Sequence, residues 1–208
     1  MVKHRFYEKT ASKQKRIQWA IAAYALLAIV ITGILSYVLH AYVFLVVIIA
    51  VVISIIAPFF DVPSLKKTGK LIYYSPLFIA EKERKGLIIV HGGTLFDYVF
   101  VIEKSWNSKK RTRIMVQQYL KGLLNLISEN EGQSHKNITI KGTSYFISEK
   151  TASRLGFTKG KLHYAQKLIL TFNYVNLLIS NSLAKKRLAF PKISKTKTYK
   201  AHLADLIQ

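Results

Sequence analysis

The chain contains a run of 44 consecutive residues, 17–60, without a single Lys, Arg, Asp or Glu. The hydrocarbon core of a bilayer is ~30 Å thick and is crossed by about 20 helical residues, so this run is long enough for two crossings. The most polar point in its middle is 38–40, and Pro58 is expected to end the second helix. The sequence therefore predicts a transmembrane hairpin with helices at about 17–37 and 41–57.

Charges that flank the uncharged run predict its orientation. Lys15 and Arg16 precede it, Lys66, Lys67 and Lys70 follow it, and the central turn carries no charge. Under the positive-inside rule both termini are then cytoplasmic, which predicts a two-pass protein of the cytoplasmic (inner) membrane. A cleaved signal peptide is the alternative, but the first apolar run is too long for one and leads directly into a second.

The excess of positive charge lies entirely outside this run. The chain has 32 Lys and Arg residues against 10 Asp and Glu residues, a formal net charge of +22. Such a surface is attracted to anionic membranes and to nucleic acids, but no nucleic-acid-binding motif is present. Cys is absent, which excludes thiolate chemistry, and the six His residues show no ligand spacing with carboxylates. We therefore expect no metal and no cofactor.

Downstream of the run, the pattern predicts a small cytoplasmic α+β domain, 61–190. Strands and helices do not alternate regularly, which argues against a doubly wound sheet. We expect the domain to lie between a basic N-terminal segment, 1–16, and a basic C-terminal tail, 191–208, that holds a short amphipathic helix. Segments rich in apolar and β-branched residues predict strands at 70–74, 86–90 and 137–141. Apolar residues at 3.6-residue spacing predict helices at 111–129 and 162–183.

The helix at 111–129 carries its charges against its own dipole. Lys109, Lys110, Arg111 and Arg113 stand at its start, where positive charge costs about 0.3–1 kcal/mol per residue. Attraction to anionic lipid is large enough to offset that cost. In the alternative interpretation, Lys109 and Lys110 lie in a loop that precedes the helix.

The helix at 162–183 is uncharged over most of its length, and polar Asn, Ser, His and Gln side chains share one arc of it. A third membrane crossing would strand the lysine-rich C-terminal segment on the outer side, against the charge rule. The helix is therefore expected to be half buried in the domain core or to lie in the membrane interface. The pattern does not decide between these two environments.

The most suggestive local motif is His91-Gly92-Gly93-Thr94, which follows a buried strand and begins a helix. Helix N-termini bind anions, and glycines let a phosphate approach the backbone, so Gly92, Gly93 and Thr94 are candidate anion-binding residues. His91 is the candidate catalytic group, as a general acid or base. Thr94 and Asp97 also match a T-x-x-D capping box, whose carboxylate would compete with a bound phosphate.

These observations support two hypotheses of function. In the first, the basic domain binds acidic phospholipids of the bilayer surface, or a membrane protein partner, without catalysis. In the second, the protein is a small membrane enzyme that acts on a phosphorylated lipid or isoprenoid carrier through the 91–94 loop. The sequence favours the first and leaves the question of catalysis open. Under the first hypothesis, the candidate cations at the membrane surface are Lys15, Arg16, Lys66, Lys67, Lys70, Lys109, Lys110, Arg111, Arg113, Lys185, Lys186 and Arg187.

Overall fold

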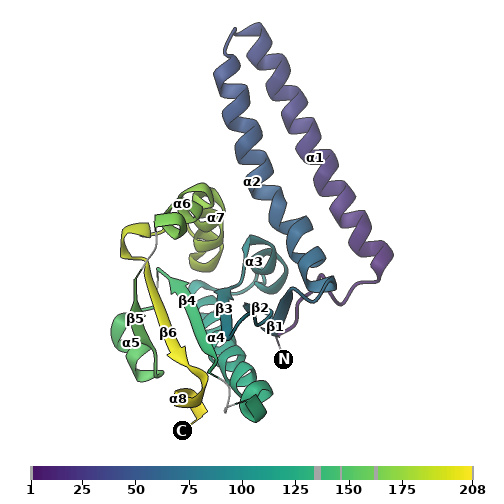
Figure 1. Ribbon diagram of the computed structural model, residues 1–208. Helices are drawn as coiled ribbons and strands as arrows, with labels where there is room; N and C mark the ends of the chain where they lie inside the picture. Colours follow the sequence, from purple (N-terminus) through teal and green to yellow (C-terminus); the bar gives the residue numbers. More distant parts are fainter. Residues whose placement is uncertain (1, 134–136, 146, 162–163, 208) are drawn as a thin grey trace.

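A helical arm projects from a small mixed domain (Figure 1). The computed structural model of the chain describes residues 2–133, 137–145, 147–161 and 164–207. The arm consists of two antiparallel helices, α1 (Ala11–Val38) and α2 (Tyr42–Lys67). Both are long enough and apolar enough to span a membrane. The predicted pair of long apolar helices and the separate α+β domain are therefore confirmed.

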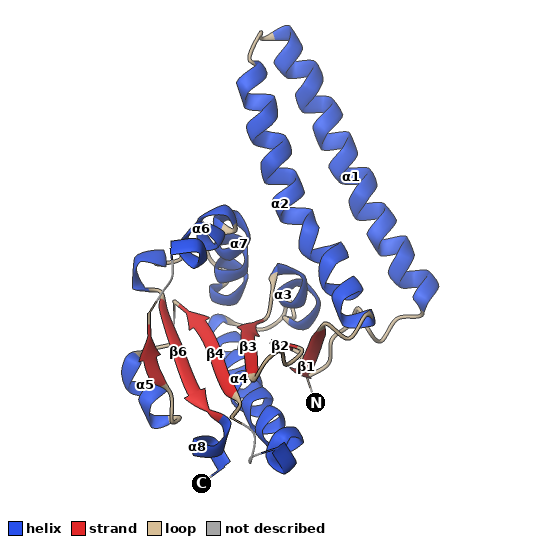
Figure 2. Ribbon diagram, in the orientation of Figure 1, coloured by secondary structure: helices blue, strands red, loops and turns tan. Residues whose placement is uncertain are grey.

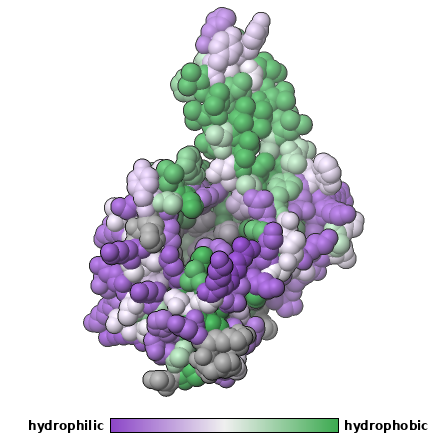
Figure 3. Space-filling view, viewed as in Figure 1, coloured by the Kyte–Doolittle hydropathy of each residue, from purple (hydrophilic) through white to green (hydrophobic). Residues whose placement is uncertain are grey.

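Along most of the arm, the side chains on the outside are apolar and exposed, as Figure 3 shows. The buried residues of α1 are Ala25 and Ser36, whose small side chains allow the two helices to pack closely. His40 closes the connection with a left-handed φ of 51°. Within the arm, the helices therefore bury little of their own apolar surface.

The second helix continues through Pro58, so the expectation that this residue ends it is wrong. A proline at this position removes the N–H that would bond to the carbonyl of Ser54, four residues earlier. In this structure the Asn176 side chain supplies the missing donor, because its Nδ2 donates to the Ser54 carbonyl at 2.8 Å. A neighbouring helix thus satisfies the group that the proline frees, as in membrane-spanning helices.

The same compensation occurs one turn later at Pro63. This residue leaves the carbonyl of Phe59 without a helical donor, and Gln18 Nε2 of α1 donates to it at 2.9 Å. Each proline of α2 is therefore paired with a side-chain amide from another helix, and these amides fix α2 against both neighbours.

This pairing gives a testable coupling. We expect Asn176→Leu to lower the free energy of unfolding by about 1–3 kcal/mol, because the Ser54 carbonyl loses the amide that donates to it. In a Pro58→Ala background, the new N–H of residue 58 can bond to that carbonyl, so the cost of Asn176→Leu should fall by about 1 kcal/mol or more. SDS titration in mild detergent, followed by circular dichroism, measures both costs. Equal costs in the two backgrounds would show that the amide does not act on this carbonyl.

The domain is built on one six-stranded mixed sheet in the order β1-β2-β3-β4-β6-β5. β3 and β4 are parallel, and the other neighbours are antiparallel. The long α4 covers one face of the sheet, while α6 and α7 lie on the side of the domain that faces the arm (Figure 2). The elements are β1 (Leu71–Ser75), β2 (Phe78–Glu81), β3 (Leu87–Gly92), α3 (Leu95–Val101), α4 (Ser108–Asn130), η1 (Glu131–Gln133), β4 (Thr139–Ser144), α5 (Glu149–Arg154), β5 (Thr158–Gly160), α6 (Tyr164–Phe172), α7 (Tyr174–Lys185), η2 (Ile193–Lys195), β6 (Lys197–His202) and α8 (Leu203–Ile207).

Both ends of the chain belong to the domain. The expected C-terminal tail, 191–208, contributes β6, which lies between β4 and β5, and then the expected short helix as α8. In β6 the alternation of buried Tyr199 and Ala201 with exposed Lys200 is the period-two pattern of a half-buried strand. At the other end Phe6 is 1% exposed, in a cluster with Val62 of α2 and Phe96 of α3.

Two helices differ from their expected form. α4 begins at Ser108, with Asn107 as its N-cap, so the interpretation in which Lys109 and Lys110 precede the helix is wrong. The predicted helix at 162–183 is two helices, α6 and α7, separated at Asn173.

Candidate functional site

A cavity of about 550 Å³ lies where the arm joins the domain. It is bordered by the carboxyl ends of the parallel strands β3 and β4, by α2 and by α7. In open sheets, ligands commonly bind at the carboxyl ends of parallel strands. The volume also falls within the ~300–1,000 Å³ range of small-molecule sites, so this cavity is the candidate site.

The walls of the cavity are mostly apolar. Leu155, Phe157 and Tyr199 line its far end, between the sheet and α5. Among the lining residues that the structure describes there is no Lys or Arg, and Glu81 is the one acidic residue. One stripe of α2 and one of α7 form the wall next to the arm, with the residues Pro58, Val62, Leu65, Asn173, Asn176, Leu177 and Ser180.

The candidate catalytic residue His91 lies on the wall of this cavity. Its Nε2 lies 3.0 Å from Oε1 of Glu81 on the neighbouring strand, and both side chains are about half exposed. A carboxylate in this position can orient the imidazole ring by accepting a hydrogen bond from it. The pair therefore provides an acid–base group at a point where the cavity meets solvent.

The candidate anion-binding residues line the cavity too, but their backbone donors already have partners. The Gly93 N–H donates to the Leu77 carbonyl at 2.8 Å, and the Thr94 N–H donates to Asp97 Oδ2 at 2.6 Å. A Cβ atom at Gly93 would lie 2.9 Å from Leu77, so this glycine serves close packing. Binding of a phosphate at Thr94 would have to displace a carboxylate, and the anion site remains a prediction.

Gly92 is held against a pair of tyrosines. A Cβ atom at this position would lie 2.6 Å from the hydroxyl of Tyr119, which in turn lies 3.1 Å from the hydroxyl of Tyr98. Burial raises the pKa of both phenols well above the ordinary value, so both remain protonated donors at neutral pH.

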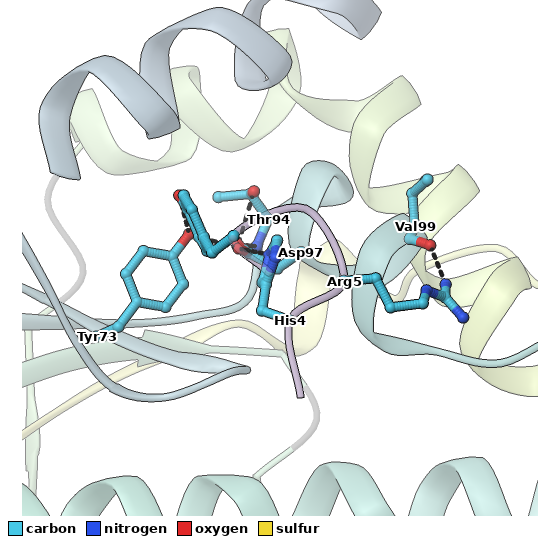
Figure 4. A network of polar contacts seen from close by, with 7 residues as sticks. His4, Arg5, Tyr73, Thr94, Asp97 and Val99 are labelled. Carbon is cyan, nitrogen blue, oxygen red and sulfur yellow. Dashed lines mark hydrogen bonds and ion pairs between the residues drawn. The ribbon is translucent and has the colours of Figure 1, made fainter. Parts of the chain in front are cut away.

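A buried polar network lies beside the cavity and centres on Asp97, which is fully buried (Figure 4). Its Oδ2 accepts hydrogen bonds from the N–H and hydroxyl of Thr94, at 2.6 and 2.8 Å, which confirms the capping box. Its Oδ1 accepts from the Tyr73 hydroxyl at 2.5 Å and from His4 Nε2 at 3.2 Å. His4 must then donate through Nε2, since a carboxylate only accepts.

This network extends to the base of the arm. The Lys66 ammonium lies 3.4 Å from the ring centroid of Tyr7 and 4.9 Å from that of Tyr73. Burial raises the pKa of Tyr7 to about 12 and that of Tyr73 further. Arg5 donates to the carbonyl of Val99 at 2.7 Å and to that of Ile102, the residue after α3, at 3.0 Å. The N-terminal segment is thus fastened to β1, α2 and α3.

Sequence analysis did not identify His4 or Tyr73, because their partners lie far away in the chain. Asp97 is 93 residues from His4 and 24 residues from Tyr73. The available signal was Asp97 itself, an acidic residue within an apolar helix start, which needs partners when buried.

The candidate surface cations fall into three groups by exposure. Arg111 is buried, and its guanidinium donates to four backbone carbonyls, those of Glu103, Lys104, Trp106 and Leu183. It therefore joins the start of α4 to the end of α7 and is not available to a lipid phosphate. Lys66 is partly buried against tyrosines, and the remaining candidates are exposed: Lys15, Arg16, Lys67, Lys70, Lys109, Lys110, Arg113, Lys185, Lys186 and Arg187.

Arg111 brings two exposed basic clusters together, one at the start of α4 and one at the end of α7.

In the part of the chain that the structure describes, no group of three His, Asp or Glu side chains is arranged to hold a metal ion. No protein-family model matches the chain, and no curated protein sequence or solved structure is significantly similar to it.

Proposed function

We propose that the protein is anchored in the cytoplasmic membrane by two crossings, α1 and α2, and that its basic domain binds the anionic lipid of the cytoplasmic surface. The uncharged parts of the two helices, 17–38 and 42–60, are about 33 and 28 Å long, close to the bilayer core. Their exposed apolar side chains would be costly in water. Both ends of the chain then lie with the domain on the cytoplasmic side, where basic residues are expected.

The observation that carries this proposal is that the apolar surface of the arm continues onto the domain. In α6, all residues of which are described, none is buried. Tyr164, Leu168, Ile169 and Phe172 are exposed there, with Phe172 73% exposed. A short helix that exposes apolar side chains beside a lysine, here Lys167, is typical of the membrane interface.

The position of α7 along α2 supports the same conclusion. Asn176 of α7 contacts Ser54, which precedes Asp61, the first charged residue after the apolar run, by about 10 Å of helix. If α2 crosses the membrane, α7 reaches below the headgroup level, and α6 beside it lies at the boundary between headgroups and acyl chains. Basic clusters at the end of α7 and the start of α4 would then face acidic headgroups, each cation contributing about 1 kcal/mol.

The alternative function, catalysis on a phosphorylated lipid through the 91–94 loop, has less support. Two backbone donors of the loop are bonded within the protein, and the described residues that line the cavity include neither Lys nor Arg. A phosphate in this cavity would therefore lack a cationic partner.

The membrane contact can be tested with a fluorophore. Because the chain has no Cys, a single introduced thiol labels one site, and Phe172→Cys on α6 carries an environment-sensitive dye. In vesicles, we expect dye emission to be quenched by lipids brominated on the acyl chain, and brominated phosphatidylglycerol should quench more than brominated phosphatidylcholine. That difference should disappear at ~1 M salt, where the Debye length is about 3 Å.

The matched control is Leu124→Cys, which is 66% exposed on α4. It should show little quenching by either lipid. Equal quenching at the two sites would contradict the interfacial position of α6. Quenching that is the same for both lipids at low salt would contradict selectivity for acidic lipid.

A further inference from the structure

The cavity lies directly on the domain side of the contact between Asn176 and Ser54. Its nearest wall consists of Pro58, Val62 and Leu65, one stripe along the last turns of α2. The α7 stripe that contains Asn176 adjoins these residues and completes the same wall. One end of the cavity therefore lies directly beside α2.

From this wall, the cavity extends past the ends of β3 and β4 to the core side of the sheet. Gly142 and Val90 border it there, and Leu155 and Phe157 line the far end. Since a single cavity touches both α2 and the residues after α5, it is long enough to reach from the base of the arm into the domain. Because the walls are mostly apolar, an apolar ligand fits the cavity better than water does along most of its length.

The composition of the lining selects the kind of ligand. With no Lys or Arg among the described lining residues, the cavity does not suit a phosphate or a carboxylate. The described lining residues include one carboxylate, Glu81, and one imidazole, His91, and both lie where the cavity meets solvent. An uncharged, elongated, apolar group fits this distribution.

We infer that the cavity takes up one hydrocarbon chain of a membrane lipid, which passes between α2 and α7 and extends toward Leu155 and Phe157. This inference rests on the proposed membrane anchorage, because it draws the chain from the bilayer that surrounds α2. The headgroup remains outside, near the basic clusters, and the chain lies in the cavity. The domain then binds lipid by its chain as well as by its charge.

Photocrosslinking of the full-length protein tests this inference. The protein is placed in nanodiscs of phosphatidylcholine and phosphatidylglycerol that contain a phosphatidylcholine with a diazirine at the end of one acyl chain. After irradiation, trypsin cleaves at Arg154 and Lys159 and releases the peptide 155–159, which reports the far end of the cavity. We expect label on this peptide as well as on the peptides of α1 and α2.

The outcomes separate the two proposals. Label on the arm but not on 155–159 would overturn the chain-binding cavity and leave the anchor intact. Absence of label from the arm would overturn the anchor itself.

A filled cavity provides the matched comparison. Ala152 lines the cavity and is 3% exposed, so Ala152→Phe places a ring in the space, whereas Ser153→Phe changes the exposed side of the same helix. We expect Ala152→Phe to reduce label on 155–159 by about fivefold or more, because two groups cannot share a close-packed space, and Ser153→Phe to leave it unchanged. Label on the arm should be the same in both variants. Undiminished label at 155–159 in a folded Ala152→Phe protein would contradict the inference, and the wild-type labelling decides it even if that variant does not fold.

Discussion

Replacement of Asp97 with alanine is expected to lower the free energy of unfolding by about 4 kcal/mol, because one buried donor and three partly buried donors lose their acceptor at once. The carboxylate accepts from the Thr94 N–H and hydroxyl, from Tyr73 and from His4, and its side chain is fully buried. Each buried donor that is left without a partner costs about 1–3 kcal/mol. Equilibrium unfolding in mild detergent, followed by circular dichroism, measures the loss.

Two further variants show whether the network is the cause. Tyr73→Phe removes one donor and keeps the ring, so we expect a loss of only about 1 kcal/mol. Asp97→Asn keeps one acceptor but directs an NH₂ group toward other donors, and its cost should fall between those of Tyr73→Phe and Asp97→Ala. If Asp97→Ala cost no more than Tyr73→Phe, the network would not stabilise the fold as described.

The second large effect is expected at Arg111. Arg111→Ala should lower the free energy of unfolding by about 3 kcal/mol, since the carbonyls that its guanidinium binds, including that of Leu183, are left partly unsatisfied. Arg111→Lys should recover little of this loss, because an ammonium group cannot reproduce the planar fork that reaches several carbonyls together. The same unfolding measurement applies.

Arg113 is the matched control for this residue. It is exposed on the same helix, two positions later, and Arg113→Ala should change the free energy of unfolding by no more than about 0.5 kcal/mol. Similar losses at the two positions would mean that the carbonyl contacts of Arg111 contribute nothing beyond removal of a cation from α4.

Sequence patterns sufficed where the determining residues lie close together in the chain. The charge-free run predicts the two long helices, and the spacing of Thr94 and Asp97 predicts the start of α3. The prediction failed at Pro58, since the amide that lets α2 continue comes from Asn176, 122 residues away from the Ser54 carbonyl it binds. A local rule for proline has no information about such a partner.

The site was predictable only in part, for the same reason. His91 and the glycines that follow it lie on the cavity wall, but the wall also needs α2, α7 and α5. Arg111 was grouped with the surface cations because its charge is visible in the sequence, whereas its carbonyl partners are backbone atoms that any residue carries. The role of His4 depends on a carboxylate 93 residues later, which no local pattern signals.

The fastening of the N-terminal segment has a consequence for the path of the chain. Phe6 and His4 share a core with Phe96, on the far side of α1 and α2 in sequence. Because these contacts hold both segments on one side, the residues between them can cross a membrane only an even number of times. This constraint does not depend on the lysines that flank the helices. A bulky fusion partner joined directly to Val2 would therefore lie close to this packed core.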